Sequence, residues 1–253
     1  MNKKLQWICA FTALGLALGG VGIALGNMDK LIMRGDRGSA QVSAAVTPPT
    51  VVIDPGHGGE DGGCSADDGT TEKQLNLMVS ENLCDILNAA GYSAVLTREE
   101  DTLLYDMYGE LDNYKGKKKV YDLKNRLRFT RESGAEYLVS IHMNKFPDKK
   151  YSGLQVYYSQ SSGQSVALAD RIQEYTRTYL QPENERMTKK AGSSIYILNR
   201  AEMPAVLVEC GFLSNDSERE KLKDGEYRKK LSLCIASAII DSVEADRART
   251  QEK

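Results

Sequence analysis

The sequence predicts an α/β fold with a mostly parallel or mixed central sheet flanked by helices. Short apolar runs alternate along the chain with segments whose apolar residues recur at helical spacing. The apolar runs are nearly continuous, which is typical of strands buried on both faces by helices. Apolar residues make up 41% of the 253 residues and charged residues 27%, so one large globular domain is expected beyond the N-terminal segment.

The first strand is expected at residues 50–54, TVVID, and the first helix at 72–90. That helix places Leu75, Val79 and Leu83 on one face, and Gly91 follows it as a common stop residue. The remaining elements are predicted, in chain order, as a strand at 92–97, a helix at 123–133, strands at 136–141 and 153–159, a helix at 165–180, strands around 194–198 and at 204–209, and a helix at 226–245.

The N-terminal segment has the composition of a membrane-spanning helix. Residues 5–28 contain no charged residue, and at about 1.5 Å per residue they are long enough to cross a hydrocarbon core of roughly 30 Å. We interpret residues 1–37 as a membrane anchor or signal segment, and favour the uncleaved anchor because a cleavable signal has a shorter apolar region. The rest of the protein would then be extracytoplasmic, either membrane-anchored or, if the segment is cleaved, secreted.

A linker separates this segment from the folded domain. Residues 38–50, GSAQVSAAVTPPT, are small, polar and proline-tipped, and have no period that would bury one face. The folded domain is therefore expected at 51–246, with a short tail at 247–253.

Charge and cysteine content exclude several classes of protein. The net charge is −2 and the pI about 5.9, without the basic excess usual for nucleic-acid binding, so no nucleic-acid partner is expected. The five cysteines are scattered and form no CxxC pair, which indicates neither a disulfide framework nor a thiolate metal site. No GK[ST] follows the glycines of GHGG, so these glycines do not indicate a nucleotide site.

One segment interrupts the alternation of strands and helices. Residues 99–121, EEDTLLYDMYGELDNYKGKKKVY, are polar and rich in tyrosine and lysine. A solvated excursion is the favoured interpretation. A substrate lid is the alternative, because long loops in compact domains are often functional.

Three side chains that can bind metal or move protons directly follow apolar runs. The chain has two histidines, His57 after VVIDPG and His142 after LVSI, and Glu209 ends PAVLVE. In an α/β sheet, ligands gather beyond the carboxyl ends of the strands, so these residues are expected to converge. The alternative interpretation of Glu209 is a structural role, in which it forms an ion pair with an arginine such as Arg200.

Two histidines and one carboxylate form a standard set of zinc ligands. Glu60 completes HGGE, the H-x-x-E spacing of zinc carboxypeptidases, whereas Glu72 lies 15 residues after His57 and opens the long helix. Spacing alone leaves both candidates open.

Four motifs together are similar to the zinc-dependent N-acetylmuramoyl-L-alanine amidases, the type-3 amidase family. They are DPGHGGEDGG, TEKQLNL, LVSIHMN and MPAVLVECGFLSNDSE, in that order and at the family's approximate spacing across residues 51–243. The resemblance implies a zinc-dependent amidase or carboxypeptidase-like sandwich fold. It also implies hydrolysis of the amide between N-acetylmuramic acid and L-alanine in peptidoglycan.

The resemblance assigns roles to individual residues. It implies that His57, Glu72 and His142 hold Zn²⁺ and that Glu209 is the catalytic glutamate, a carboxylate that takes a proton from water and returns it to the leaving amine. Asn144, in the third motif, is a candidate substrate-binding residue.

The single-domain form, the N-terminal apolar segment and the KKVYDLKNRL run look most like the spore-cortex, germination-specific amidases, in which cleavage precedes muramic δ-lactam formation. Met143 and the KKAGSS run depart from the usual family pattern, so the substrate groove is expected to differ.

Two alternatives remain: a zinc peptidase or carboxypeptidase acting on wall peptides, and a non-catalytic, membrane-tethered wall-binding protein. The sequence does not identify an activator protein.

Overall fold

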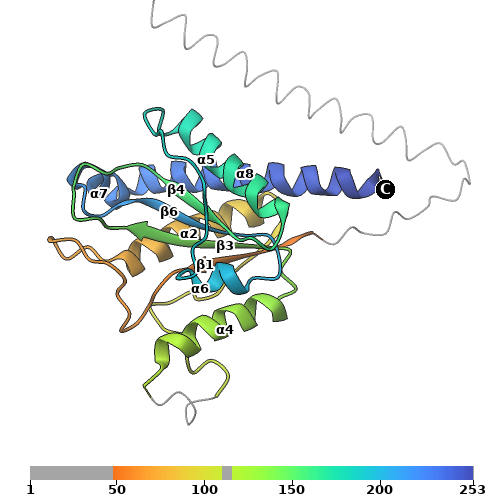
Figure 1. Cartoon of the computed structure of the whole chain (residues 1–253), viewed down its shortest axis with the longest axis horizontal. Coiled ribbons are helices and arrows are strands. Elements are labelled where there is room, and N and C mark those ends of the chain that lie inside the picture. The colour runs from red at the N-terminus through yellow and green to blue at the C-terminus, as the bar shows by residue number, and fades with distance from the viewer. Residues whose placement is uncertain (1–47, 110–115, 253) are drawn as a thin grey trace, which may run out of the picture. The chain divides into compact units, whose positions relative to one another are not determined.

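The computed structural model describes residues 48–109 and 116–252, and six strands within them form one mixed sheet in the order β2-β1-β3-β6-β4-β5 (Figure 1). Neighbouring strands are parallel from β2 to β6, β4 runs antiparallel to β6, and β5 is parallel to β4 at the edge. The strands are β1 (Thr50–Pro55), β2 (Ser93–Leu96), β3 (Tyr137–Asn144), β4 (Gln155–Tyr158), β5 (Lys189–Lys190) and β6 (Ala205–Phe212). The predicted fold class is confirmed.

Helices cover both faces of the sheet (Figure 1). On one face α2 and α5 pack against α8, and on the other α4 packs with α6. A further helix, α7, follows β6. The helices are α2 (Glu72–Ala89), α4 (Lys118–Glu132), α5 (Gly163–Tyr179), α6 (Tyr196–Arg200), α7 (Asp216–Lys223) and α8 (Gly225–Gln251).

The central strands contribute to a core on each side of the sheet. Val51 and Ile53 of β1 pack in the larger cluster beneath α2 and α8, whereas Val52 packs in the smaller cluster beneath α4 and α6. All three side chains are fully buried. Because successive strand residues point to opposite faces, a strand covered on both faces is apolar at most positions, and a buried polar residue such as Asp54 needs partners.

Several predicted elements differ in the structure. The strand expected around 194–198 is wrong, because this segment leads into the short helix α6, whose Ile197 and Leu198 are buried against the sheet. An apolar run this short does not distinguish a strand from a buried helical turn. Helix α4 begins five residues earlier than expected, and α8 extends to Gln251 through most of the predicted tail. Helix α7 and strand β5 were not predicted.

The predicted membrane anchor at 1–37 and most of the linker at 38–50 lie outside the described residues. None of the helices within 48–109 and 116–252 is long and apolar enough to cross a membrane.

The described part of the 99–121 segment packs against the domain. Leu104 is buried, and its backbone N–H donates to Asp122 of α4 at 2.7 Å. Asp101 accepts hydrogen bonds from the backbone of Gly59 at 2.8 Å and from Lys73 at 2.7 Å. Most residues of this part are nevertheless exposed, as expected for a solvated excursion, while Asp101 and Leu104 attach it to the loop after β1 and to α4.

Candidate functional site

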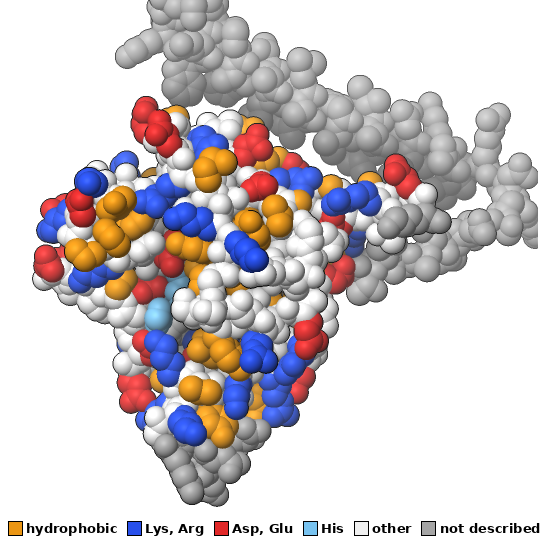
Figure 2. Space-filling view, viewed as in Figure 1, with side chains coloured by type: hydrophobic (Ala, Val, Ile, Leu, Met, Phe, Trp, Pro, Cys, Tyr) orange, Lys and Arg blue, Asp and Glu red, His pale blue; other side chains and the backbone are white. Residues whose placement is uncertain are grey.

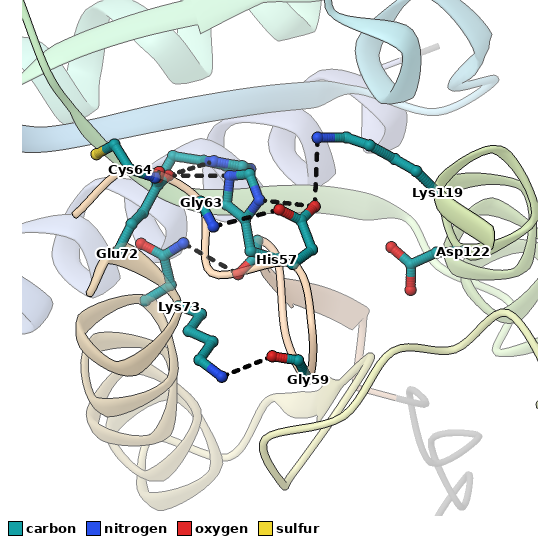
Figure 3. A network of polar contacts seen from close by, with 12 residues as sticks. His57, Gly59, Gly63, Cys64, Glu72, Lys73, Lys119 and Asp122 are labelled. Carbon is teal, nitrogen blue, oxygen red and sulfur yellow. Dashed lines mark hydrogen bonds and ion pairs between the residues drawn. The ribbon is translucent and has the colours of Figure 1, made fainter. Parts of the chain in front are cut away.

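Three side chains from separate parts of the chain converge at the carboxyl ends of the parallel strands. His57 lies in the loop after β1, Glu72 is the first residue of α2, and His142 lies near the end of β3. Their candidate ligand atoms all lie within 4.8 Å of one another. Figure 3 shows His57 and Glu72 facing each other, and Glu72 Oε1 is 3.3 Å from His57 Nε2 and 2.9 Å from His142 Nδ1.

Backbone hydrogen bonds fix the carboxylate of Glu72. Its Oε2 accepts from the backbone N–H of Cys64 at 2.8 Å, and its Oε1 accepts from that of Met143 at 3.2 Å. Burial opposes ionisation, but the hydrogen bonds and charges of the two histidines outweigh it and hold the pKa of Glu72 well below its usual range. A buried anionic oxygen is therefore held between two imidazole rings.

His57 has a backbone conformation that is uncommon for a side-chain-bearing residue. Its φ is +63°, in the left-handed region, where a non-glycine residue stores strain that the surrounding structure must maintain. Its Nδ1 lies 3.0 Å from Asp61 Oδ2, but the two groups are not aligned for a hydrogen bond. The ammonium group of Lys119 lies 3.3 Å from the same oxygen (Figure 3). Burial lowers the pKa of His57, but Glu72 and then Asp61 outweigh it, so that the pKa is raised.

The glycines of the first motif allow this close approach. A Cβ atom on Gly56 would lie 2.2 Å from Cε1 of His142, and one on Gly63 would lie 2.5 Å from Oε2 of Glu72. Gly63 also has a φ of +67°, which favours glycine. The glycines around His57 therefore make room for the other two side chains of the cluster.

A buried arginine, which the sequence did not single out as a site residue, anchors the loop that carries His57. Arg126 of α4 is 1% exposed and donates hydrogen bonds to Asp54 Oδ1 at 2.7 Å, to the carbonyls of Pro55 at 2.7 Å and His57 at 2.6 Å, and to Asp122 Oδ2 at 2.8 Å. Burial raises the pKa of Asp54, but Arg126 and two hydroxyl donors outweigh it and lower the pKa to about 2. The loop is thus tied to α4 through a buried ion pair.

Glu209 lies beside the cluster on β6, directly opposite His142 in the sheet register. Its Oε2 is buried and makes no hydrogen bond. Burial, reinforced by the charge of Glu72, raises the pKa of Glu209 to about 7, although the histidines oppose the shift. The alternative ion pair with Arg200 is wrong, because no ion pair joins the two within the described residues and the Arg200 guanidinium lies 5.9 Å from the ring of Tyr196.

The two candidate carboxylates for the third ligand are in different environments. Glu60 is exposed and forms an ion pair with Lys118 at 2.8 Å, whereas Glu72 lies between the histidines. Asn144 lies two residues beyond His142 at the end of β3, on the same face of that strand. It does not line the cavity at the cluster.

The cluster opens into a cavity of about 250 Å³. His57, His142 and Glu209 line it on the sheet side, while residues of α4 and of the segment 194–197 form its other walls. Figure 2 shows histidine side chains exposed at this surface. A substrate can therefore reach both histidines and the carboxylate of Glu209.

The donor atoms fit a zinc ion. Zinc prefers imidazole nitrogen and carboxylate oxygen, with bonds of about 2.0–2.2 Å in tetrahedral geometry, which places neighbouring ligand atoms roughly 3.3–3.5 Å apart. The 3.3 Å between His57 Nε2 and Glu72 Oε1 matches this spacing, whereas the 2.9 Å between Glu72 Oε1 and His142 Nδ1 is a hydrogen-bond distance, and all three ligand atoms lie within 4.8 Å of one another. With three protein ligands, one position would remain for water or substrate.

A mixed sheet covered by helices, with this cluster at the carboxyl ends of its parallel strands, defines an α/β protein with a candidate metal centre. The sequence matches the N-acetylmuramoyl-L-alanine amidase family over residues 51–241. The chain belongs to that family and is an amidase of peptidoglycan, which confirms the resemblance found in the four motifs.

Individual relatives support the same assignment. The chain is 31% identical over 240 residues to the germination-specific N-acetylmuramoyl-L-alanine amidase of Bacillus subtilis, across 95% of each protein. The structure of the CwlD amidase from Clostridioides difficile in complex with the GerS lipoprotein is similar, with a TM-score of 0.72, 35% identity, and coverage of 78% of this chain and 99% of that one. The amidase AmiC2 of Nostoc punctiforme gives a TM-score of 0.65 at 30% identity, with 78% and 97% coverage.

Proposed function

We propose that the protein hydrolyses the amide between N-acetylmuramic acid and L-alanine with a Zn²⁺ ion held by His57, Glu72 and His142. The observation that carries this proposal is the convergence of the three ligand atoms beside the unpartnered carboxylate of Glu209. When bound, the ion supplies Lewis-acid activation of water and of the scissile carbonyl.

Glu209 is the proton carrier in this proposal. Its buried Oε2 has no hydrogen-bond partner and is available to accept a proton from the attacking water. The same carboxyl group then donates that proton to the nitrogen of L-alanine as the amide breaks. A group that performs both steps works best with a pKa near the working pH, and burial moves the pKa of Glu209 in that direction.

Asn144 is proposed to bind substrate at the edge of the site. It lies on the same face of β3 as His142 and is partly exposed. Its side-chain amide can both donate and accept hydrogen bonds, which suits the acetamido and peptide groups of the substrate.

The biological setting we propose is the spore cortex, with the protein held outside the cytoplasm by residues 1–37. The relative from Bacillus subtilis is described as germination-specific, and the relative from Clostridioides difficile was solved with a lipoprotein, which supports action at a membrane surface with a protein partner. Cleavage leaves a free lactyl carboxylate on the sugar. A separate deacetylase would free the sugar amine, and the two groups could then close the muramic δ-lactam.

Deletion of the gene in the source organism tests this setting. Without the protein, cortex muramic acids should keep their peptides and contain no lactam, as measured by mass spectrometry of cortex muropeptides. Expression of the parent protein should restore the lactam, whereas Glu209→Gln should not. Normal lactam content in the deletion strain would show that the spore-cortex assignment is wrong.

A further inference from the structure

Arg98 is a buried arginine whose hydrogen bonds all run to backbone carbonyls. It lies just after β2 and is 3% exposed. Its guanidinium group donates to the carbonyls of Pro55 at 3.0 Å, Gly56 at 3.1 Å, Lys73 at 2.9 Å and Glu100 at 2.9 Å. Within the part of the chain that the structure describes, no carboxylate forms an ion pair with it.

The burial of this charge is unfavourable for the fold. Burial, reinforced by the charge of Arg126, lowers the pKa of Arg98 to about 10, although nearby aspartates oppose the shift. A buried charge without a directly paired counter-ion costs free energy, which its hydrogen bonds have to offset. The role of Arg98 therefore depends on what its four carbonyl partners hold in place.

Two of these carbonyls lie beside candidate metal ligands. Gly56 directly precedes His57 in the loop after β1. Lys73 directly follows Glu72 in the first turn of α2. A single nitrogen of Arg98, Nη2, donates to the carbonyls of both Gly56 and Lys73. One atom therefore joins the segment that carries His57 to the segment that carries Glu72.

The residues that follow Arg98 reinforce the same junction. Asp101 accepts hydrogen bonds from the backbone of Gly59 and from the side chain of Lys73, and Lys73 also donates to the carbonyl of Gly59 at 2.6 Å (Figure 3). A Cβ atom on Gly58 would lie 2.1 Å from the carbonyl oxygen of Thr102. The backbone after β2 is thus packed directly against the loop after β1.

Arg126 does not duplicate this junction. Its hydrogen bonds join the loop after β1 to α4, and none of them reaches α2. His57 has a positive φ, a conformation that persists only where the surrounding structure maintains it. A metal-binding constellation has to be held within about 0.5 Å of its productive geometry. The spacing between the loop and α2 therefore needs a tie of its own.

We propose that Arg98 is a positioning residue of the metal site and holds His57 and Glu72 at ligand spacing. It acts through the backbone carbonyls beside these two residues, because it hydrogen-bonds to neither side chain and does not line the cavity at the cluster. The inference rests on the proposed ligand set, and it assigns a role to a residue outside the four sequence motifs.

The zinc affinity of the full-length protein, measured by titration against a competing chelator, provides the test. Arg98→Met removes all four hydrogen bonds and should bind zinc about tenfold more weakly than the parent, the lower end of the usual effect of groups that orient metal ligands. The matched control is Arg177→Met in α5, which removes hydrogen bonds to the carbonyls of Asn184 and Arg186 and should bind zinc as the parent does. An unchanged affinity in Arg98→Met, or an equal loss in both variants, would overturn the inference.

Cobalt absorption separates altered ligand geometry from a general loss of stability. Co²⁺ bound in place of zinc has a visible spectrum that depends on the number and arrangement of its ligands. At saturating cobalt the bands of Arg98→Met should shift or weaken, whereas Arg177→Met should keep the spectrum of the parent. A spectrum of Arg98→Met identical to that of the parent would show that Arg98 does not set the ligand geometry.

Arg98→Lys carries the same two comparisons if Arg98→Met does not fold. Lysine keeps the buried charge, but its single nitrogen cannot reproduce the planar fork that reaches four carbonyls. The variant should therefore show weaker zinc binding and an altered cobalt spectrum, both to a smaller extent. Parent-like values of both would overturn the inference.

Glu72→Ala separates this inference from the proposed ligand set. If Glu72→Ala keeps its zinc, the ligand set itself is wrong. If Glu72→Ala loses zinc while Arg98→Met binds it as the parent does, the ligand set stands and the positioning role of Arg98 is wrong.

Discussion

Replacement of Glu72 by alanine is expected to remove zinc from the protein. Glu72 supplies the one carboxylate oxygen that lies between both histidine nitrogens, and its own position is fixed by two backbone N–H donors. Loss of a group that only orients a ligand typically lowers metal affinity about 10–100-fold, so loss of the ligand itself should lower it by more than about 100-fold. Metal analysis of the purified variant after dialysis measures the effect.

Glu60→Ala is the matched control for this prediction. Glu60 lies in the same loop as His57, but it is exposed and paired with Lys118, so zinc content should stay close to that of the parent. The opposite pattern, with zinc lost from Glu60→Ala and kept by Glu72→Ala, would replace the amidase ligand set with that of the carboxypeptidases.

Glu209→Gln is expected to separate metal binding from chemistry. The amide keeps the shape of the side chain but cannot accept the proton from water, and removal of a positioned base lowers turnover by about two to four orders of magnitude. The substituted atom has no hydrogen-bond partner in the fold, so the thermal midpoint and the zinc content should persist. Steady-state kinetics beside metal analysis give both readouts, and activity within a few fold of the parent would remove Glu209 from the mechanism.

The sequence predicted the convergence of His57, His142 and Glu209 for a physical reason. Each follows a nearly continuous apolar run, and in a parallel sheet the ends of such runs meet at one edge. Spacing alone did not decide which carboxylate is the third candidate ligand, because Glu60 and Glu72 are both compatible with it. The decision depends on the turn from His57 to α2, in which His57 and Gly63 adopt positive φ.

Other parts of the site required tertiary contacts that no local pattern shows. Arg126 occurs in a helix rich in lysine and arginine, a composition that predicts solvated side chains. In the structure it is almost completely buried between Asp54 and Asp122. The sequence signal for this buried ion pair is the i, i+4 spacing of Asp122 and Arg126, which places both side chains on the same, buried face of α4. The 194–198 segment was assigned to the wrong type of element because a short apolar run fits a strand and a buried helical turn equally well.

Cleavage at this site is expected to break the bond between the sugar and the peptide. The most direct measurement is mass spectrometry of the products that the purified, zinc-loaded protein forms from a defined disaccharide–peptide. The expected products are an intact disaccharide with a free lactyl carboxylate and a complete peptide that begins with a free L-alanine amine. Release of terminal amino acids alone, with the sugar–peptide bond intact, would contradict this expectation.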